Sequence, residues 1–222
     1  MADVALQRKN MVESQVRTND VTDRRIINAM LEVPREAFVP TALKPVAYMD
    51  EALILARAKD GAPARGMMAP RVLAKLLQLA EIGAGDVVLD VGAATGYSTA
   101  VIGRLAQTVV ALESDPAMVE TATKALEGLG ADNIAIVTGD LEVGYPSEGP
   151  YDAIVVEGEV EEIPAGLLDQ LKDGGRLVAI KAGVPGRATR WRRAGRTFDS
   201  RADFTAAAAA LPGFAKKREF VF

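Results

Sequence analysis

Two residue types are missing from this chain altogether, because it contains no cysteine and no histidine. Without cysteine there can be no disulfide, thiolate zinc site or thiol nucleophile. Without histidine the chain lacks the commonest metal ligand and the side chain that most often acts as a general base near neutral pH. We therefore expect no metal site, and a reaction that depends on positioning its reactants.

Long apolar runs and strong charge are also missing. No run approaches the roughly 18 residues that a membrane-spanning helix needs. The N-terminus lacks a signal-peptide pattern, so we expect a cytoplasmic protein without a membrane partner. The net charge of −4 and the pI of about 5.1 argue against binding to nucleic acid. With 222 residues, 49% of them hydrophobic, the chain can bury a sizeable core.

Hydrophobic periodicity divides the chain into two parts. Residues 1–80 have a largely helical pattern and form an N-terminal extension, whereas residues 81–222 alternate strands with helices. The expected strands are 87–91, 109–112, 134–138, 153–156 and 176–180. The expected helices are 12–17, 23–33, 70–79, 98–105, 116–129 and 165–171, the second of them capped by Asp20 or Thr22. This order predicts one compact α/β unit with a doubly wound, Rossmann-like sheet.

The C-terminal residues follow a different pattern. From Arg187 to Phe198, arginine alternates with threonine and aromatic residues. In an acidic protein this favours a hairpin with solvated arginines over a nucleic-acid site. We interpret Ala206–Ala210 as a helix, and Arg218–Phe222 as a strand that pairs antiparallel at the sheet edge.

The most informative stretch is V-L-D-V-G-A-A-T-G-Y at residues 88–97. Its apolar start suits a buried parallel strand, and its small residues let the backbone turn and approach a ligand before a helix begins near Tyr97. The small residues in question are Gly92, Ala94 and Gly96. Asp90 precedes the turn, where a carboxylate suits a ligand with a cationic end rather than a phosphate. Taken alone, such a turn can also be a plain connection between strand and helix.

Acidic residues also follow later strands. Glu113 lies about twenty residues further on, at the tip of the next strand, where it can accept both ribose hydroxyls of an adenosine. Asp140, with Leu141 beside it, follows strand 134–138, where a carboxylate can accept from an adenine amino group or simply belong to a turn. Glu157 ends the fourth strand and points toward the place of a second substrate. The alternative for Glu157 is a solvated acidic loop, because three more glutamates follow by residue 162.

These residues carry a resemblance at two levels. V-L-D-V-G-x-x-T-G-Y resembles motif I of the class I methyltransferases, which use S-adenosyl-L-methionine. More discriminating are M-V-E-S-Q-V-R at 11–17, I-N-A-M-L-E-V-P-R-E-A-F-V-P at 27–40 and the pair Ala47-Tyr48. Together they resemble the protein-L-isoaspartate O-methyltransferase family. The similarity continues through later segments to the closing aromatic strand.

This resemblance implies a repair-type enzyme that methylates the α-carboxylate of an isoaspartyl residue in damaged protein, using S-adenosyl-L-methionine and no metal. It places the cofactor against a set of residues along the carboxyl ends of the strands. That set consists of Asp90, Gly92, Ala94, Gly96, Tyr97, Glu113, Asp140 and Leu141.

The departures from the family pattern fall where the acceptor should bind. The family's T-I-S-x-P segment carries a serine associated with activity, but residues 66–70 here read G-M-M-A-P, so Met68 stands at the serine position. A thioether donates no hydrogen bond and accepts only weakly. After the fourth strand the family carries small and hydroxyl residues, whereas this chain has Glu157-Gly158-Glu159. Ala94 is a milder change, replacing the middle glycine of motif I.

A second carboxylate at Glu157 would repel an anionic acceptor by roughly 1 to 3 kcal/mol at about 5 Å. Four cations in the segment over the site either offset this by holding the acceptor's carboxylate or are solvated loop charges. They are Arg57, Lys59, Arg65 and Arg71.

Three interpretations stay open at this point. The first is an isoaspartyl carboxyl methyltransferase in which the backbone of residues 66–70 replaces the serine. The second is a methyltransferase of the same fold that modifies a phenol, an amine or a small acid, with Glu157 as general base or cation partner. The third is a noncatalytic S-adenosylmethionine-binding protein. The partner is accordingly a protein, a peptide or a small-molecule acceptor, and no oligomeric state is indicated.

Overall fold

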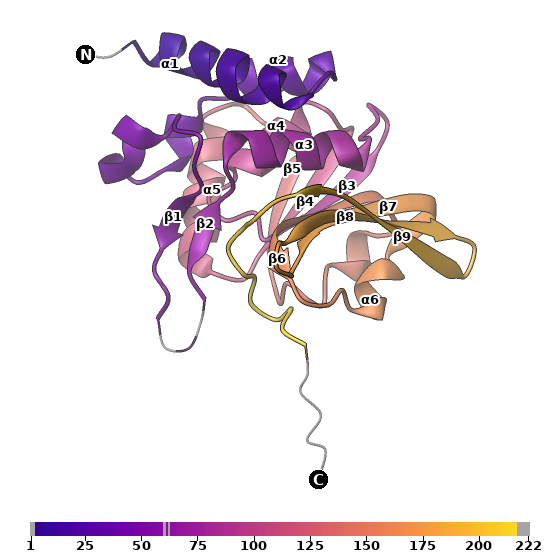
Figure 1. Ribbon diagram of the computed structural model, residues 1–222. Coiled ribbons are helices and arrows are strands. Elements are labelled where there is room, and N and C mark those ends of the chain that lie inside the picture. Colours follow the sequence, from indigo (N-terminus) through magenta and orange to yellow (C-terminus); the bar gives the residue numbers. More distant parts are fainter. Residues whose placement is uncertain (1–2, 60, 62, 217–222) are drawn as a thin grey trace.

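The structure, a computed structural model, describes residues 3–59, 61 and 63–216. Its centre is a seven-stranded sheet in the order β5-β4-β3-β6-β7-β8-β9 (Figure 1). The parallel strands are β3 (Val87–Val91), β4 (Thr108–Glu113), β5 (Ile134–Thr138), β6 (Tyr151–Val160) and β7 (Leu171–Lys181). Two antiparallel strands, β8 (Arg187–Ala194) and β9 (Thr197–Thr205), complete one edge. The expected doubly wound sheet with an antiparallel C-terminal edge is confirmed.

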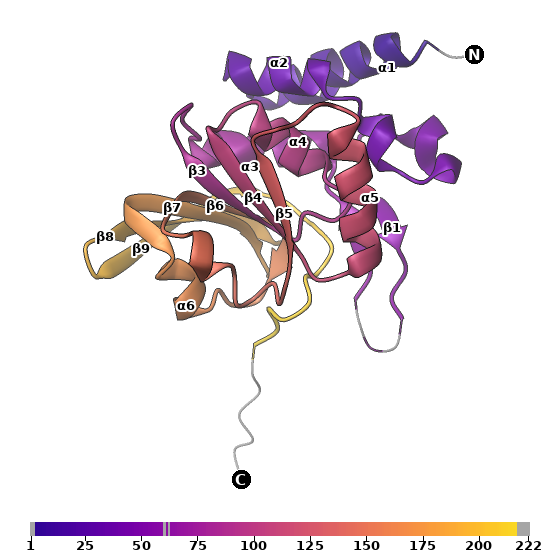
Figure 2. The ribbon, with the colours of Figure 1, turned by 180° about the vertical axis from the view of Figure 1, so that it is seen from behind.

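Helices cover the two faces of the sheet unequally. One face carries α3 (Pro70–Ala80), α4 (Tyr97–Gly103) and α5 (Pro116–Glu127), and the other carries the short α6 (Ala165–Leu168) (Figures 1 and 2). Because strand side chains alternate between faces, Val88 joins the apolar cluster under α3 to α5, while Leu89 joins the cluster that includes α6. Asp90 shares the face of Val88 and therefore points toward α4.

The N-terminal residues lie across the helical face. They form α1 (Val4–Met11), a π-helical turn (Val12–Val16), a 3₁₀ turn (Arg17–Asn19) and α2 (Arg24–Glu32), which lie over α3 and α4 in Figure 1. Their apolar side chains belong to the same buried cluster as those of the sheet. The expected caps of α2 are wrong, because the side chain of Asp23 accepts from the backbone N–H of Arg25. Asp20 instead ends the 3₁₀ turn with a φ of 62°.

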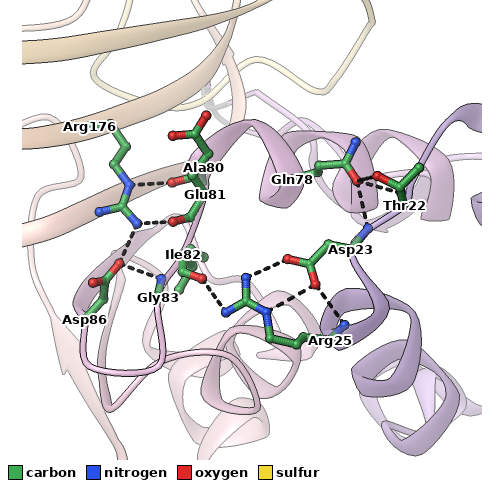
Figure 3. Close-up of polar contacts among 10 residues, drawn as sticks. All are labelled: Thr22, Asp23, Arg25, Gln78, Ala80, Glu81, Ile82, Gly83, Asp86 and Arg176. Atoms are coloured by element: carbon green, nitrogen blue, oxygen red, sulfur yellow. Dashed lines mark hydrogen bonds and ion pairs between the residues drawn. The ribbon is translucent and has the colours of Figure 1, made fainter.

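Polar contacts hold this N-terminal part against the turn that leads into β3, as Figure 3 shows. Gln78 of α3 accepts through Oε1 from the backbone N–H groups of Thr22 and Asp23, at 2.7 and 3.1 Å. Arg25 donates to the carbonyl of Ile82 at 2.9 Å. Arg176 of β7 donates to the end of α3 and pairs with Asp86. The start of β3 is therefore fixed from two sides.

Residues between α2 and α3 include a small separate sheet. After two 3₁₀ segments (Arg35–Phe38 and Thr41–Val46), β1 (Leu53–Ala56) and β2 (Arg65–Met67) pair antiparallel with each other and not with the central sheet. The hairpin projects beside the carboxyl ends of the central strands (Figures 1 and 2). It is the element that carries Arg65 to the site.

The expectations for the C-terminal residues had different outcomes. The arginine-rich hairpin is confirmed as β8 and β9. The helix expected at Ala206–Ala210 is wrong, because the chain there is extended and pairs with the end of β6. The backbone N–H of Glu159 donates to the carbonyl of Ala209 at 2.8 Å, and that of Leu211 donates to the carbonyl of Glu159 at 3.0 Å. Unpaired backbone groups on β6 thus outweigh the helix propensity of alanine. The strand expected at 218–222 lies outside the described residues.

Two smaller differences concern lengths. The helix expected at 165–171 ends at Leu168, because Leu171 already begins β7. The strand expected at 153–156 runs from Tyr151 to Val160. None of the helices in the described part of the chain has the length and apolarity needed to cross a membrane.

Candidate active site

The candidate site lies at the carboxyl ends of β3, β4 and β6, where the chain order reverses and where open α/β sheets bind their ligands. The turn after β3 has three residues in the left-handed region, Gly92, Ala94 and Gly96, with φ of 82°, 48° and 93°. Ala94 takes up this conformation despite its Cβ, and its N–H donates to Glu113 at 2.8 Å. The turn is therefore built around the acid of the next strand.

Asp90 is a buried carboxyl group with a free oxygen. Thr99 and Ser98 of α4 donate to its Oδ2 at 2.6 and 3.2 Å. Its Oδ1 has no hydrogen-bond partner among the described residues. Burial raises the pKa of Asp90 to about 7. The group therefore has unused capacity to accept a hydrogen bond or to balance a cation.

Glu157 lies on β6, the strand next to β3, just beyond the last residue that pairs with β3 and within an irregular part of β6. The pairing of β6 with β7 shifts between Val155 and Glu159, so a bulge surrounds Glu157. Bulges redirect side chains, and Glu157 is buried, with Oε1 unpartnered among the described residues. Burial, and then the nearby charge of Asp90, raise the pKa of Glu157 well above its usual value, although Arg35 works in the opposite direction. Burial therefore favours the protonated, neutral form of Glu157.

Arg35 belongs to the V-P-R motif of the sequence, and in the structure it binds the backbone that lines the site. It is fully buried, and it donates to the carbonyls of Ala47 and Met68 at 2.9 and 2.7 Å. Its guanidinium lies 4.7 Å from the ring centroid of Tyr97. Arg35 thus fixes the backbone at Met68 and packs on Tyr97. The burial of this arginine leaves no signal in the composition, so only the V-P-R motif at residues 33–35 indicates it.

Glu113 is also buried, but its carboxylate is fully engaged. Arg65 of β2 donates to both oxygens at 2.7 Å, and backbone N–H groups of Ala94, Ser114 and Asp115 donate as well. Burial alone would raise the pKa of Glu113, but the hydrogen bonds and charge of Arg65 bring it below its usual value. Glu113 is therefore an ionised carboxylate paired within the protein.

The remaining predicted residues are dispersed around this centre. Asp140 is exposed, and Leu141 is buried in the cluster on the α6 face. Tyr97 is buried, with a hydroxyl that finds no partner among the described residues. Of the cations expected over the site, Arg65 is buried, whereas Arg71 pairs with Asp50 at the surface. In the described ranges no three or more histidine, cysteine or acidic side chains are grouped to hold a metal.

One cavity joins the acceptor side to the motif turn. Met68, Tyr97 and Glu157 line it together with the turn at 92–95. Its volume is about 10 Å³, which is room for about one water molecule, whereas small-molecule sites typically enclose about 300 to 1,000 Å³. The structure thus brings Met68 and Glu157 to one site, and it shows that site closed.

Comparisons with known proteins agree on one family. The family model described as protein-L-isoaspartate(D-aspartate) O-methyltransferase matches residues 6–193. A protein-L-isoaspartate O-methyltransferase of Methanoculleus marisnigri is 40% identical over 173 residues, which cover 78% of this chain and 76% of that protein. A relative of the same name from Koribacter versatilis is 37% identical over 181 residues, covering 82% of this chain and 78% of the relative.

Solved structures extend the likeness to three dimensions. A structure named protein-L-isoaspartate O-methyltransferase superposes with a TM-score of 0.81 at 27% identity, covering 93% of this chain and 66% of that one. A structure from Plasmodium falciparum, named a putative protein-L-isoaspartate O-methyltransferase and solved in complex with S-adenosyl-L-homocysteine, gives a TM-score of 0.76 at 19% identity, covering 95% of this chain and 99% of that one. At 19% identity that second likeness shows the fold alone.

The family match ends at residue 193, so it does not include the closing strand to which the resemblance was extended. Within residues 6–193 it contains the motif turn, Met68 and Glu157. The match spans most of the chain and the relatives share more than a third of their aligned residues. The chain therefore belongs to the protein-L-isoaspartate O-methyltransferase family of S-adenosylmethionine-dependent methyltransferases.

Proposed function

We propose that this protein transfers a methyl group from S-adenosyl-L-methionine to the carboxylate of an isoaspartyl residue in a protein or peptide. Family membership supports the reaction class. The observation on the structure that carries the proposal is the pair of unpartnered, buried carboxyl oxygens on Asp90 and Glu157, at the ends of the neighbouring strands β3 and β6. Buried polar atoms without partners are costly unless a ligand satisfies them.

The residues present fit the methionine half of this cofactor. Asp90 offers a free oxygen to the cofactor's amino group, beside a turn whose small residues allow close approach. Because burial raises the pKa of Asp90 to about 7, a bound cation would favour its ionised form. The adenosine half would meet Glu113, with Asp140 and Leu141 beyond it. When bound, the cofactor supplies an activated methyl group on a sulfonium.

Glu157 can take over the task of the missing serine. As an ionised group it would repel the acceptor's carboxylate. As a neutral acid it donates a hydrogen bond through its O–H, and such a bond to a carboxylate is short and strong. We therefore assign Glu157 to holding the acceptor carboxylate beside Met68. Burial and the charge of Asp90 favour the protonated form of Glu157, and the charge of Arg35 opposes it.

The acceptor is in this proposal a protein or peptide, in the cytoplasm, with no nucleic acid involved. The net charge of −4 fits that expectation. A different methyl acceptor is the second candidate function, and the observation that favours it is the replacement of the serine by Met68 together with the acidic side chain of Glu157 on the same cavity.

The test is a methyl-transfer assay with labelled S-adenosyl-L-methionine. The purified protein is incubated with an isoaspartyl peptide, with the matched aspartyl peptide and with a cell extract. We expect label on the isoaspartyl peptide and none on the aspartyl control. Label that enters only small molecules of the extract would replace this proposal with the second candidate. Binding of the cofactor without transfer to any acceptor would favour a noncatalytic protein.

A further inference from the structure

Two segments far apart in the sequence meet over the turn that follows β3. One is β2, which carries Arg65, and the other is the extended segment 206–214 after β9. Figure 1 shows the latter, in yellow, passing the end of β6 beside the β1–β2 hairpin. A Cβ on Gly66 of β2 would lie 3.9 Å from the Cβ of Ala209, so the segments touch.

Arg65 occupies the hydrogen-bonding capacity of Glu113. The two guanidinium nitrogens Nη1 and Nη2 each donate to one carboxylate oxygen at 2.7 Å. With the three backbone N–H groups already described and the hydroxyl of Ser114 at 3.4 Å, the carboxylate accepts six hydrogen bonds. A carboxylate has about four lone-pair sites. Glu113 therefore has no capacity left for the two hydroxyls of a ribose.

Leu211 fills the space between the ends of β3 and β6. A Cβ built on Gly92 would lie 3.0 Å from Leu211 Cδ2, and one built on Gly158 would lie 2.4 Å from Leu211 Cγ. Leu211 is 6% exposed. Its backbone N–H donates to the carbonyl of Glu159, and the carbonyl of Ala209 two residues earlier accepts from the N–H of Glu159. The side chain thus lies directly against the glycine that motif I provides for close approach of a ligand.

We propose that this is a closed state in which Arg65 competes within the molecule for Glu113, and in which Leu211 blocks the turn at Gly92. Cofactor entry then requires the β1–β2 hairpin and segment 206–214 to move apart. The inference rests on the proposed function for its ligand, S-adenosyl-L-methionine. Segment 206–214 lies beyond the family match at residues 6–193.

The hairpin is suited to moving as a unit. It has only two strands and pairs with no strand of the central sheet. A two-stranded sheet contributes little stability of its own. When the hairpin swings outward, it carries Arg65 toward solvent, so that the guanidinium is not left buried without a partner. Glu113 would then exchange the Arg65 hydrogen bonds for those of a ribose.

The closed state should weaken cofactor binding. The apparent dissociation constant equals that of the open form divided by the fraction of molecules that are open. If about 90% of molecules are closed, the dissociation constant is about tenfold weaker than that of the open form. Arg65→Met removes the competitor while keeping a long side chain. Leu211→Ala removes the block from the other side. Lys172→Met is the matched control, since it breaks an ion pair with Asp152 at the opposite end of β6.

The experiment measures binding of S-adenosyl-L-homocysteine by calorimetry and its association rate by stopped-flow fluorescence. We expect Arg65→Met to bind at least about tenfold more tightly than the unmodified protein and to associate faster. Leu211→Ala should shift both quantities in the same direction, and Lys172→Met should change neither. Binding by the variants where the unmodified protein shows none would support the closed state most strongly.

Suppose that the unmodified protein binds S-adenosyl-L-homocysteine and that a folded Arg65→Met variant binds it equally or more weakly. This result overturns the closed state and leaves the proposed function intact. Failure of every form to bind, the two variants included, overturns both. If Arg65→Met does not fold, Leu211→Ala decides, and an affinity equal to that of the unmodified protein counts against the closure.

Discussion

Glu157 is the residue whose expected role differs most between the sequence and the structure. As a carboxylate next to an anionic acceptor it would oppose the family's reaction. In the structure it is buried near Asp90, and burial raises its pKa well above the usual value. An acid that stays protonated can donate to the acceptor's carboxylate instead of repelling it. Under the proposed function, the buried side chain of Glu157 would therefore support the reaction.

The first prediction concerns the charge state of Glu157. We expect Glu157→Gln to retain activity on an isoaspartyl peptide within about threefold, because the amide is also a neutral donor, whereas Glu157→Leu should lose at least about tenfold in kcat/KM. Activity of the unmodified protein should fall as pH rises through the pKa of Glu157, and this alkaline fall should be absent in Glu157→Gln. A rate that falls on the acid side, together with an inactive Gln variant, would make Glu157 a general base and refute the assignment.

The second prediction concerns Met68, the residue at the family's serine position. If Glu157 already holds the acceptor carboxylate, restoring a hydroxyl adds little. Met68→Ser should then raise kcat/KM on an isoaspartyl peptide by less than about tenfold, the equivalent of about 1.4 kcal/mol. Met68 is buried, so the variant should also lose about 1 to 3 kcal/mol of stability. A larger gain, absent with the aspartyl peptide, would show that the lost hydroxyl was the main deficit.

At the scale of elements, the site depends on an irregular strand. The bulge in β6 redirects Glu157 inward. Because β3 ends opposite Val156, the backbone of Glu159 pairs on that side with segment 206–214. Gly158 makes this possible, because Leu211 packs directly on its Cα. Beyond the bulge, β6 resumes its pairing with β7 at Glu159 and Val160.

The third prediction tests this packing. Gly158→Ala places a Cβ 2.4 Å from Leu211 Cγ and 2.8 Å from the carbonyl of Ala209. The substitution should lower the free energy of unfolding by about 1 to 3 kcal/mol, as overpacking does. Urea unfolding measures this loss, and Gly158→Ala combined with Leu211→Ala should lose less than the sum of the two single variants. Additive losses would mean that the two residues do not compete for one space.

At the scale of the whole molecule, burial of acids near the centre links stability to pH. Asp90 titrates near 4 in an unfolded chain and at about 7 in the folded protein. Between these values the folded state holds the proton and the unfolded state does not. Stability from this group is therefore greatest below pH 4 and is lost as the pH rises to about 7. Glu157 acts in the same direction.

The fourth prediction is that Asp90→Asn weakens this dependence. The amide oxygen can still accept from Ser98 and Thr99, and the group no longer titrates. When the pH rises from 5 to 8, the free energy of unfolding of the variant should improve by at least about 1 kcal/mol relative to that of the unmodified protein. This is roughly the equivalent of one pKa unit. Denaturant unfolding at both pH values checks this. If the free energy of unfolding changes with pH equally in the two proteins, Asp90 has an ordinary pKa in the folded state.

The sequence by itself determined the fold class and the parallel strands of the sheet. Alternation of apolar runs and the motif at 88–97 placed β3 and the turn correctly, because buried parallel strands and sharp turns have strict local requirements. The N-terminal motif determined the family. These features depend on residues close in the chain, which is why pattern alone sufficed.

Only the tertiary structure decided what the charged residues do. Arg65 and Glu113 are separated by 48 positions in the chain, and nothing local marks them as partners. The alanines at 206–210 form no helix, because the end of β6 offers backbone hydrogen bonds. Burial favours the protonated form of Glu157, and long-range pairing with Arg65 engages the carboxylate of Glu113. Both depend on residues that only the fold brings together.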